Sequence, residues 1–154
     1  LALAPGGGGG DLAFRPAAGH VFAPHPAQPA VVEFNRFGQI LRTLPLATLT
    51  APPSALAFDT ARDRLLALGG GDLPRVTVHD LAGQRLAAFA LDGAVTLTSL
   101  AYDSAHRELY APLAREPAVG IFNDQGHLVR TLPLPPAAPA PFLDVGPRSF
   151  LRLF

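Results

Sequence analysis

One spacing recurs through this chain and limits the possible folds more than any other feature. Phe14, Phe58 and Tyr102 stand 44 residues apart (58 − 14 and 102 − 58). The blocks around them read LAFRPAAGHVFAP, LAFDTARDRLLAL and LAYDSAHRELYAP. Each block is a short apolar run, a polar turn and a second apolar run, which is the pattern of a β-hairpin. A period of this length indicates a chain built from stacked copies of one structural unit.

A second block follows in each unit and predicts another hairpin. It reads VVEFNRFGQILRTLPL, VTVHDLAGQRLAAFAL and VGIFNDQGHLVRTLPL, and the first and third versions agree at nine of sixteen positions. Each version places Asn or Asp three residues before Gly, in the segments Asn35–Gly38, Asp80–Gly83 and Asn123–Gly126. This spacing predicts a turn in which the Asn or Asp oxygen bonds to the main chain and Gly takes a left-handed conformation.

Each unit therefore predicts four strands in succession. Pro45 and Pro133 lie in the fourth strand of their units, and proline cannot donate a ladder hydrogen bond, so we expect this strand at the sheet edge. The first two strands are apolar at nearly consecutive positions, which is typical of sheets covered on both faces. We expect an all-β, β-propeller-like fold with three four-stranded antiparallel blades and half of a fourth.

The repeat divides the chain into a leader and successive units. Residues 1–10 form a Gly-rich leader, interpreted as flexible because it lacks the strand, helix and Lys of a phosphate-binding loop. The units span about 11–54, 55–98 and 99–141, and a half unit over 142–154 would turn at Gly146-Pro147-Arg148. Closed propellers generally need four or more blades. We therefore expect a fragment of a larger propeller protein, or copies that associate to complete a ring.

Composition argues against several classes of protein. Twelve Arg and no Lys stand against 12 acidic residues, so no net field favours nucleic acid as a partner. No Cys is present, which excludes disulfides and thiolate metal sites, and no apolar run is long enough for a membrane span. The opening Leu-Ala-Leu-Ala is compatible with a signal-peptide remnant, although Pro5 argues against cleavage there. The compartment stays open on this basis, with a periplasmic or secreted location favoured.

No cluster in the sequence has the spacing of a catalytic or metal site. The segment Asn123–His127 offers oxygen ligands but lacks the Glu that closes a calcium loop, so we interpret it as a turn. Asp59 and Asp103 occupy equivalent positions, and a repeated carboxylate favours a cap on the turn between first and second strands. The first strands begin at Leu12, Leu56 and Leu100 and offer no metal ligand to a central channel. We predict no catalytic residue, no metal and no cofactor.

Binding is expected where the units differ most from one another, in the connections between their second and third strands. Variable loops on a rigid scaffold are common binding sites. The candidate ligand-binding residues are His25, Asp72, Arg75, Arg115 and Glu116. The partner would be a protein or a small molecule of unknown identity.

The blocks FDTARDRLLAL and VTVHDLAGQRLAAFAL resemble the repeats of YVTN-type and NHL-type β-propellers, over roughly residues 11–154. The second strands read LLALG or LYAPL in place of the Tyr-Val-Thr-Asn string. The resemblance implies a blade with its fourth strand outermost. It leaves the function open, because these families include binding proteins, protein-interaction and RNA-binding modules, lactonases and lyases.

These observations favour a non-enzymatic scaffold that binds a ligand or a protein. The alternative is a lactonase-like hydrolase or lyase whose active site lies partly outside this chain. Because the first unit and the end of the chain are apolar rather than polar caps, we also expect the isolated chain to self-associate.

Overall fold

The computed structural model describes residues 11–69, 74–93, 95–135, 143–145 and 151–153. In these residues every regular element is a β-strand, which confirms the predicted all-β class. Since this part of the chain forms no helix, it contains none that is long and apolar enough to cross a membrane. The Gly-rich leader, Asp72 and the expected turn at Gly146-Pro147-Arg148 lie outside the described residues.

Three four-stranded antiparallel sheets are present, as the repeat predicts, and each pairs its strands in chain order. The first sheet consists of β1 (Ala13–Arg15), β2 (His20–Pro24), β3 (Ala30–Phe34) and β4 (Ile40–Pro45). The second consists of β5 (Ala55–Asp59), β6 (Arg64–Gly69), β7 (Arg75–His79) and β8 (Arg85–Ala90). The third consists of β9 (Ala101–Asp103), β10 (Glu108–Pro112), β11 (Ala118–Asn123) and β12 (Leu128–Pro133). A separate hairpin pairs β13 (Leu143–Val145) with β14 (Leu151–Leu153).

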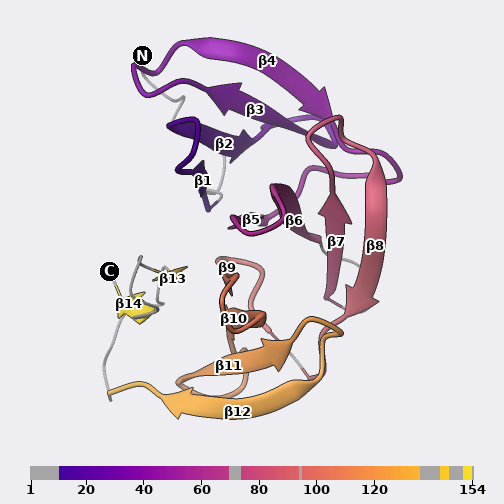
Figure 1. The fold of residues 1–154 in the computed structure, drawn as a ribbon. Helices are drawn as coiled ribbons and strands as arrows, with labels where there is room; N and C mark the ends of the chain where they lie inside the picture. Colours follow the sequence, from indigo (N-terminus) through magenta and orange to yellow (C-terminus); the bar gives the residue numbers. More distant parts are fainter. Residues whose placement is uncertain (1–10, 70–73, 94, 136–142, 146–150, 154) are drawn as a thin grey trace.

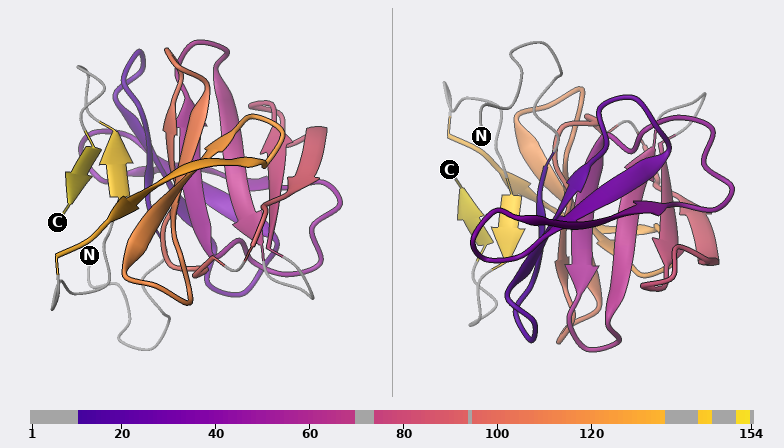
Figure 2. Two further views of the ribbon diagram at one scale, coloured as in Figure 1. Left: turned by 90° about the horizontal axis from the view of Figure 1, so that it is seen from below. Right: turned by 90° about the horizontal axis from the view of Figure 1, so that it is seen from above.

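The sheets fan out around a common centre (Figure 1). Their first strands, β1, β5 and β9, lie innermost, and their fourth strands, β4, β8 and β12, lie outermost. Figure 2 shows the sheets from below and above, standing side by side as separate layers. In the described residues no strand pairing joins one sheet to the next, and β13 lies beside β9.

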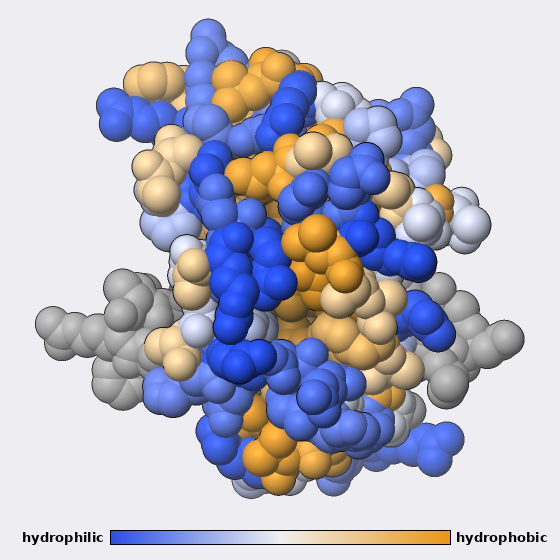
Figure 3. All heavy atoms as spheres, turned by 45° about the vertical axis from the view of Figure 1, so that its right-hand side comes forward, coloured by the Kyte–Doolittle hydropathy of each residue, from blue (hydrophilic) through white to orange (hydrophobic). Residues whose placement is uncertain are grey.

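The fourth strands are edge strands, as the two prolines predict. Pro45 is the last residue of β4 and faces Ala30, and Pro133 is the last residue of β12 and faces Ala118. The outer strands are largely exposed, and apolar side chains on them include Ile40, Leu86 and Val129. Figure 3, seen from the side of β8, shows this apolar surface as separate patches interrupted by polar side chains.

The turns between third and fourth strands have the predicted geometry. In each turn the Oδ1 atom of Asn35, Asp80 or Asn123 accepts two main-chain N–H groups at 2.9–3.0 Å. The glycine three residues later has a positive φ of 77°, 83° or 91°. Such a φ is accessible to glycine without steric cost, which explains the repeated spacing.

The same turns join the sheets to one another. Ala47, two residues after β4, donates its N–H to the carbonyl oxygen of Gly83 at 2.9 Å, and Asp92 donates in the same way to Gly126 at 2.9 Å. The fit is close, because a Cβ on Gly83 would lie 2.1 Å from the carbonyl oxygen of Pro45. Gly38, in the turn of the first sheet, has open space around it. We call the bond between Ala47 and Gly83, and its counterpart, the junction bonds.

Apolar side chains fill the spaces between neighbouring sheets. The rings of Phe22 and Phe58 stack at 5.9 Å between the first and second sheets, and every residue of β5 is buried. The expectation that the first strands are covered on both faces holds for β5 and β9 but is wrong for β1. Phe14 in β1 is 54% exposed and Leu12, just before it, is 60% exposed, whereas their counterparts in the later units are at most 9% exposed. The difference arises because the preceding sheet covers that position in the second and third units.

A carboxylate just before β1 also connects the first and third sheets near the centre. Asp11 accepts hydrogen bonds from the hydroxyl of Ser99 at 2.8 Å and the N–H of Leu100 at 2.9 Å. The sequence repeat alone does not predict this contact, because Asp11 stands outside the repeated block.

Candidate functional site

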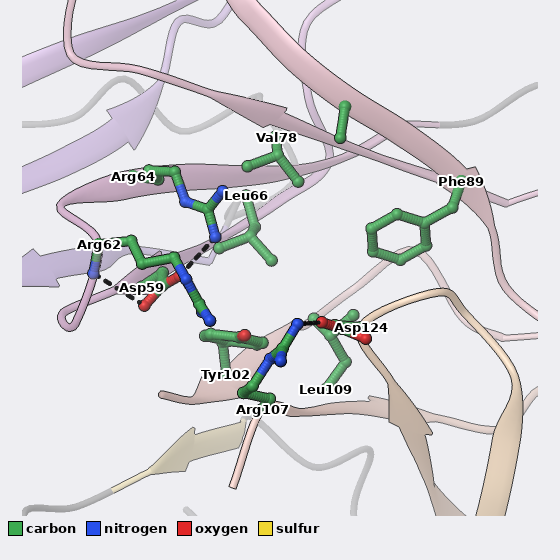
Figure 4. A pocket seen from close by; sticks show the side chains of 11 residues that line it. Asp59, Arg62, Arg64, Leu66, Val78, Phe89, Tyr102, Arg107, Leu109 and Asp124 are labelled. Carbon is green, nitrogen blue, oxygen red and sulfur yellow. Dashed lines mark hydrogen bonds and ion pairs between the residues drawn. The ribbon is translucent and has the colours of Figure 1, made fainter. Parts of the chain in front are cut away.

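A cavity of about 230 Å³ lies between the second and third sheets (Figure 4). Both sheets and their turns contribute to its walls, which consist of Asp59, Arg62, Arg64, Leu66, Val78, Ala87, Phe89, Tyr102, Arg107, Leu109 and Asp124. It lies toward the ends of the sheets where the first strand turns into the second and the third into the fourth. It therefore belongs to a pair of units rather than to one.

The polar wall on the second sheet is organised by Asp59, the last residue of β5. One oxygen of its buried carboxylate caps the following turn by accepting the N–H groups of Ala61 and Arg62 at 3.1 and 3.2 Å. The other accepts hydrogen bonds from the side chains of Arg64 at 2.9 Å and Arg62 at 3.3 Å. Burial alone would raise the pKa of Asp59, but these hydrogen bonds outweigh it and the pKa is lowered. The carboxylate therefore stays ionised and orients both guanidinium groups.

The third sheet supplies a second ion pair and an aromatic ring. Arg107 pairs with Asp124 across two turns of the sheet. Tyr102 is buried, and burial followed by the charge of Asp59 raises the pKa of its hydroxyl. Figure 4 shows the guanidinium of Arg62 extending toward Tyr102, and Arg107 meeting Asp124 on the other side of that ring. Three guanidinium groups thus face the cavity from two sheets.

The opposite wall is apolar. Leu66 and Val78 come from the inner part of the second sheet, Phe89 comes from β8, and Leu109 comes from β10. Figure 4 shows the ring of Phe89 across the cavity from the arginines. The cavity can therefore hold a molecule with one charged end and one apolar end.

The cavity exists because two long side chains of the first sheet have short counterparts in the second. In the first sheet, the buried carboxylate of Glu33 is held by His20 at 2.7 Å and Arg42 at 2.6 Å. By alignment of the repeat, Val78 and Ala87 replace Glu33 and Arg42 in the second sheet.

Arg64 stands at the position of His20 and has no carboxylate at position 78 to bind. Its side chain is bonded to Asp59 through one terminal nitrogen, while its Nε is buried and has no hydrogen-bond partner. A buried donor without a partner is costly, because its hydrogen bond to water is lost and not replaced.

The structure places four of the sequence-predicted binding residues, His25, Arg75, Arg115 and Glu116, at the other end of the sheets. His25 caps its own loop, accepting the N–H groups of Ala27 and Gln28 at 3.2 and 3.1 Å. Arg75 is the first residue of β7 and is exposed, as are Arg115 and Glu116 in the connection before β11. Within the described residues these three make no ion pair with one another, and their role in binding stays a prediction.

The predicted caps on the turns between first and second strands are confirmed. Asp59 caps as described above, and Asp103 accepts the N–H groups of Ala105 and His106 at 2.8 and 3.2 Å. Sequence reasoning missed that Arg62, Arg64 and Arg107 in these same turns also line a cavity. A comparison of equivalent positions in the three units could have indicated the cavity. Val78 and Ala87 are shorter than the residues at the same positions of the first and third units.

Among the described residues, no group of three or more His, Cys, Asp or Glu side chains could hold a metal ion. The absence of a metal and of a cofactor stays a prediction from the sequence.

Comparison with known proteins relates the chain to others by fold. No family model and no curated protein matches it. Solved structures that match include a protein of unknown function from Bacteroides caccae (TM-score 0.64, 14% identity, 97% of this chain and 53% of that one). Kuenenia stuttgartiensis hydrazine synthase also matches, with a TM-score of 0.61 and 13% identity over 96% of this chain and 42% of that one. U3-55K matches with a TM-score of 0.57 and 17% identity over 92% of this chain and 44% of that one. This chain spans about half the length of these structures, and identities this low show the fold alone.

Proposed function

We propose that this chain is a non-enzymatic binding scaffold of β-propeller type, and that it holds a small ligand in the cavity between its second and third sheets. In this proposal the three sheets are adjacent blades, β13 and β14 belong to a fourth, and the chain is part of a larger propeller. The single observation that carries the ligand site is the cavity whose charged and apolar walls come from two neighbouring units.

Several further features support the scaffold. Each sheet docks on the next through a junction bond, so the sheets form a repeating support on which side chains can vary. Rigid elements hold the cavity residues in place, because Asp59 is fixed by its own turn as well as by two arginines. Preorganised polar groups beside an apolar wall are the usual composition of a small-molecule site. A YVTN-type or NHL-type repeat and an extracytoplasmic location remain parts of the proposal that rest on the sequence.

The proposal is tested by amide-detected nuclear magnetic resonance with a set of small carboxylic acids, amines and neutral aromatic compounds. We expect some of them to shift the amide signals of both walls, in the segments Asp59–Arg64 and Tyr102–Leu109, and to be recovered chemically unchanged. Ala87→Leu, which fills the cavity, should remove these shifts. Ala88→Leu is the matched control, because successive residues of a strand point to opposite faces of the sheet.

Three outcomes would overturn the proposal. Shifts confined to the loops of His25, Arg75 and Arg115 would move the site to the other end of the sheets. Absence of any shift in the two wall segments would remove the ligand site. Turnover of a lactone in the presence of calcium or zinc would support the lactonase-like alternative.

A further inference from the structure

The first and second sheets differ in one side chain beside a conserved basic position. The first sheet has a carboxylate there, Glu33, and the second sheet has none. In the first sheet the Glu33 carboxylate bridges His20 and Arg42 at 2.7 and 2.6 Å. In the second sheet Arg64 stands at the position of His20, but Val78 provides no carboxylate, and the Arg64 Nε is buried without a partner. The second sheet thus keeps the basic residue, Arg64, beside the cavity and lacks the carboxylate.

We propose that this cavity binds a small monocarboxylate with a compact apolar body, whose carboxylate takes the place that Glu33 has in the first sheet. The inference rests on the proposed function above and specifies the ligand class. The carboxylate would accept a hydrogen bond from the Arg64 guanidinium, and the apolar body would lie against Val78, Phe89 and Leu109.

The charges of the cavity favour a single negative charge. Three guanidinium groups, those of Arg62, Arg64 and Arg107, face two carboxylates, those of Asp59 and Asp124. The excess is therefore one positive charge, which one carboxylate balances. A planar guanidinium matches a carboxylate well, because two parallel N–H groups can meet two oxygens.

The size and lining of the cavity limit the rest of the ligand. Its volume of about 230 Å³ is below the range of about 300–1,000 Å³ typical of sites for drug-sized molecules. The wall opposite the arginines offers the ring of Phe89 and the branched side chains of Val78 and Leu109. A single aromatic ring or a short branched chain fits this description, and benzoate is a suitable probe.

Calorimetric titration with benzoate and with benzamide separates charge from shape, because the two probes differ mainly in the carboxylate. We expect benzoate to bind with a Kd on the order of 1 mM, as befits so small a ligand, and benzamide to bind at least ~10-fold more weakly. Inorganic phosphate should compete poorly, since it cannot use the apolar wall.

Two variants test the assigned position in different ways. Arg64→Gln removes the cation and should weaken benzoate binding at least ~10-fold. Val78→Glu retains Arg64 and restores the carboxylate of the first sheet, so it should also abolish benzoate binding while unfolding at no lower urea concentration than the wild type. Arg36→Gln is the control, because Arg36 lies on the first sheet over the ring of Phe37, and it should bind benzoate as the wild type does.

The inference is overturned if benzamide or phosphate binds as tightly as benzoate, or if either Arg64→Gln or folded Val78→Glu retains wild-type affinity. Binding of neutral aromatics at the same wall segments would leave the ligand-binding scaffold standing and reject the carboxylate. Binding of none of the probes there would reject both.

Discussion

At the scale of single residues, the turn glycines join two sheets as well as ending a hairpin. Gly83 has a φ of +83°, and its carbonyl accepts the junction bond from Ala47. Gly38 has a φ of +77° but contacts no other sheet at the position where a Cβ would stand. The two positions therefore separate the cost of a left-handed backbone from the cost of losing the contact between sheets.

We predict that Gly83→Ala destabilises the chain more than Gly38→Ala does. Gly38→Ala should lower the unfolding free energy by about 1–2 kcal/mol, the usual cost of a left-handed conformation in a residue with a Cβ. Gly83→Ala should lower it by about 3–5 kcal/mol, because the new Cβ would also displace the carbonyl of Pro45 and break the junction bond. Urea denaturation of the two variants measures the difference, and equal losses would mean that the junction contributes no stability.

A buried histidine gives the fold a pH dependence. His79 is fully buried, its Nδ1 bonds to the carbonyl of Gly83 at 3.2 Å, and its Nε2 bonds to the hydroxyl of Thr77 at 2.9 Å. Burial lowers the pKa of His79 below its ordinary value of 6.5. The unfolded chain therefore takes up a proton near pH 6.5 that the folded chain refuses, so unfolding becomes easier as the pH falls.

We predict that His79 lowers the unfolding free energy as the pH falls from 7.5 to 5.5, by at most about 1.4 kcal/mol per pH unit. His106 acts in the opposite direction, because its hydrogen bond to Asp103 raises its pKa. The informative comparison is therefore between the wild type and His79→Gln, measured by urea denaturation at each pH. The variant should show a weaker decline toward acid, and an unchanged slope would contradict the assignment.

At the scale of strands and sheets, position in the stack decides how strongly each sheet is held. The second sheet has a neighbour on each face, and its central strands β6 and β7 are paired on both edges. In the first sheet β2 and β3 are paired in the same way, but the face that carries Phe14 is open. The two sheets thus have the same hydrogen-bond pairing, but only the second is covered by another sheet on both faces.

We predict that amide hydrogens exchange more slowly in β6 and β7 than in β2 and β3. Local opening is easier where fewer buried apolar contacts must be broken. Hydrogen–deuterium exchange read by mass spectrometry gives the order directly. Protection of β2 and β3 equal to that of β6 and β7 would indicate that another part of the chain, or a second copy, covers the first sheet.

The strands and turns were predictable because their signals are local. Asn35 and Gly38 lie in one turn, and the edge position of β4 follows from Pro45 alone. The cavity was not predictable in the same way, because it depends on which side chains of the second sheet face Tyr102 and Leu109 of the third. The exposure of Phe14 likewise depends on the arrangement of sheets, since the equivalent Phe58 is buried.

At the scale of the whole molecule, the first sheet presents an open apolar face to solvent. Phe14, Val21 and Phe34 lie opposite one another across β1, β2 and β3, and Leu12 precedes them with 60% of its surface exposed. Burying a side chain such as Leu12 or Phe14 contributes about 1.5–3 kcal/mol. Apolar surface of this kind favours contact between copies.

We predict that the isolated chain self-associates at micromolar concentration. Light scattering should give a mass above the 16.1 kDa of one chain. Phe14→Asp should shift the mass toward the monomer, because it places a charge on the open face. Phe37→Asp is the matched control, since Phe37 is 73% exposed but lies in a turn. A monodisperse wild-type monomer with a cooperative melt would show that the first sheet needs no cover.

The junction bonds have a consequence for how such a molecule could change by duplication. They join main-chain atoms, so they require only a glycine in the receiving turn and, two residues after the donating strand, a residue with an N–H. Ala47 and Asp92 meet this requirement, whereas Pro135 at the equivalent place after β12 does not. A unit could therefore be duplicated, deleted or exchanged wherever the glycine and the N–H donor of a junction bond are both present. Copying one unit would not copy the cavity, because the cavity walls come from two neighbouring units. A single unit is therefore enough to extend the fold, whereas the site requires a specific pair of units.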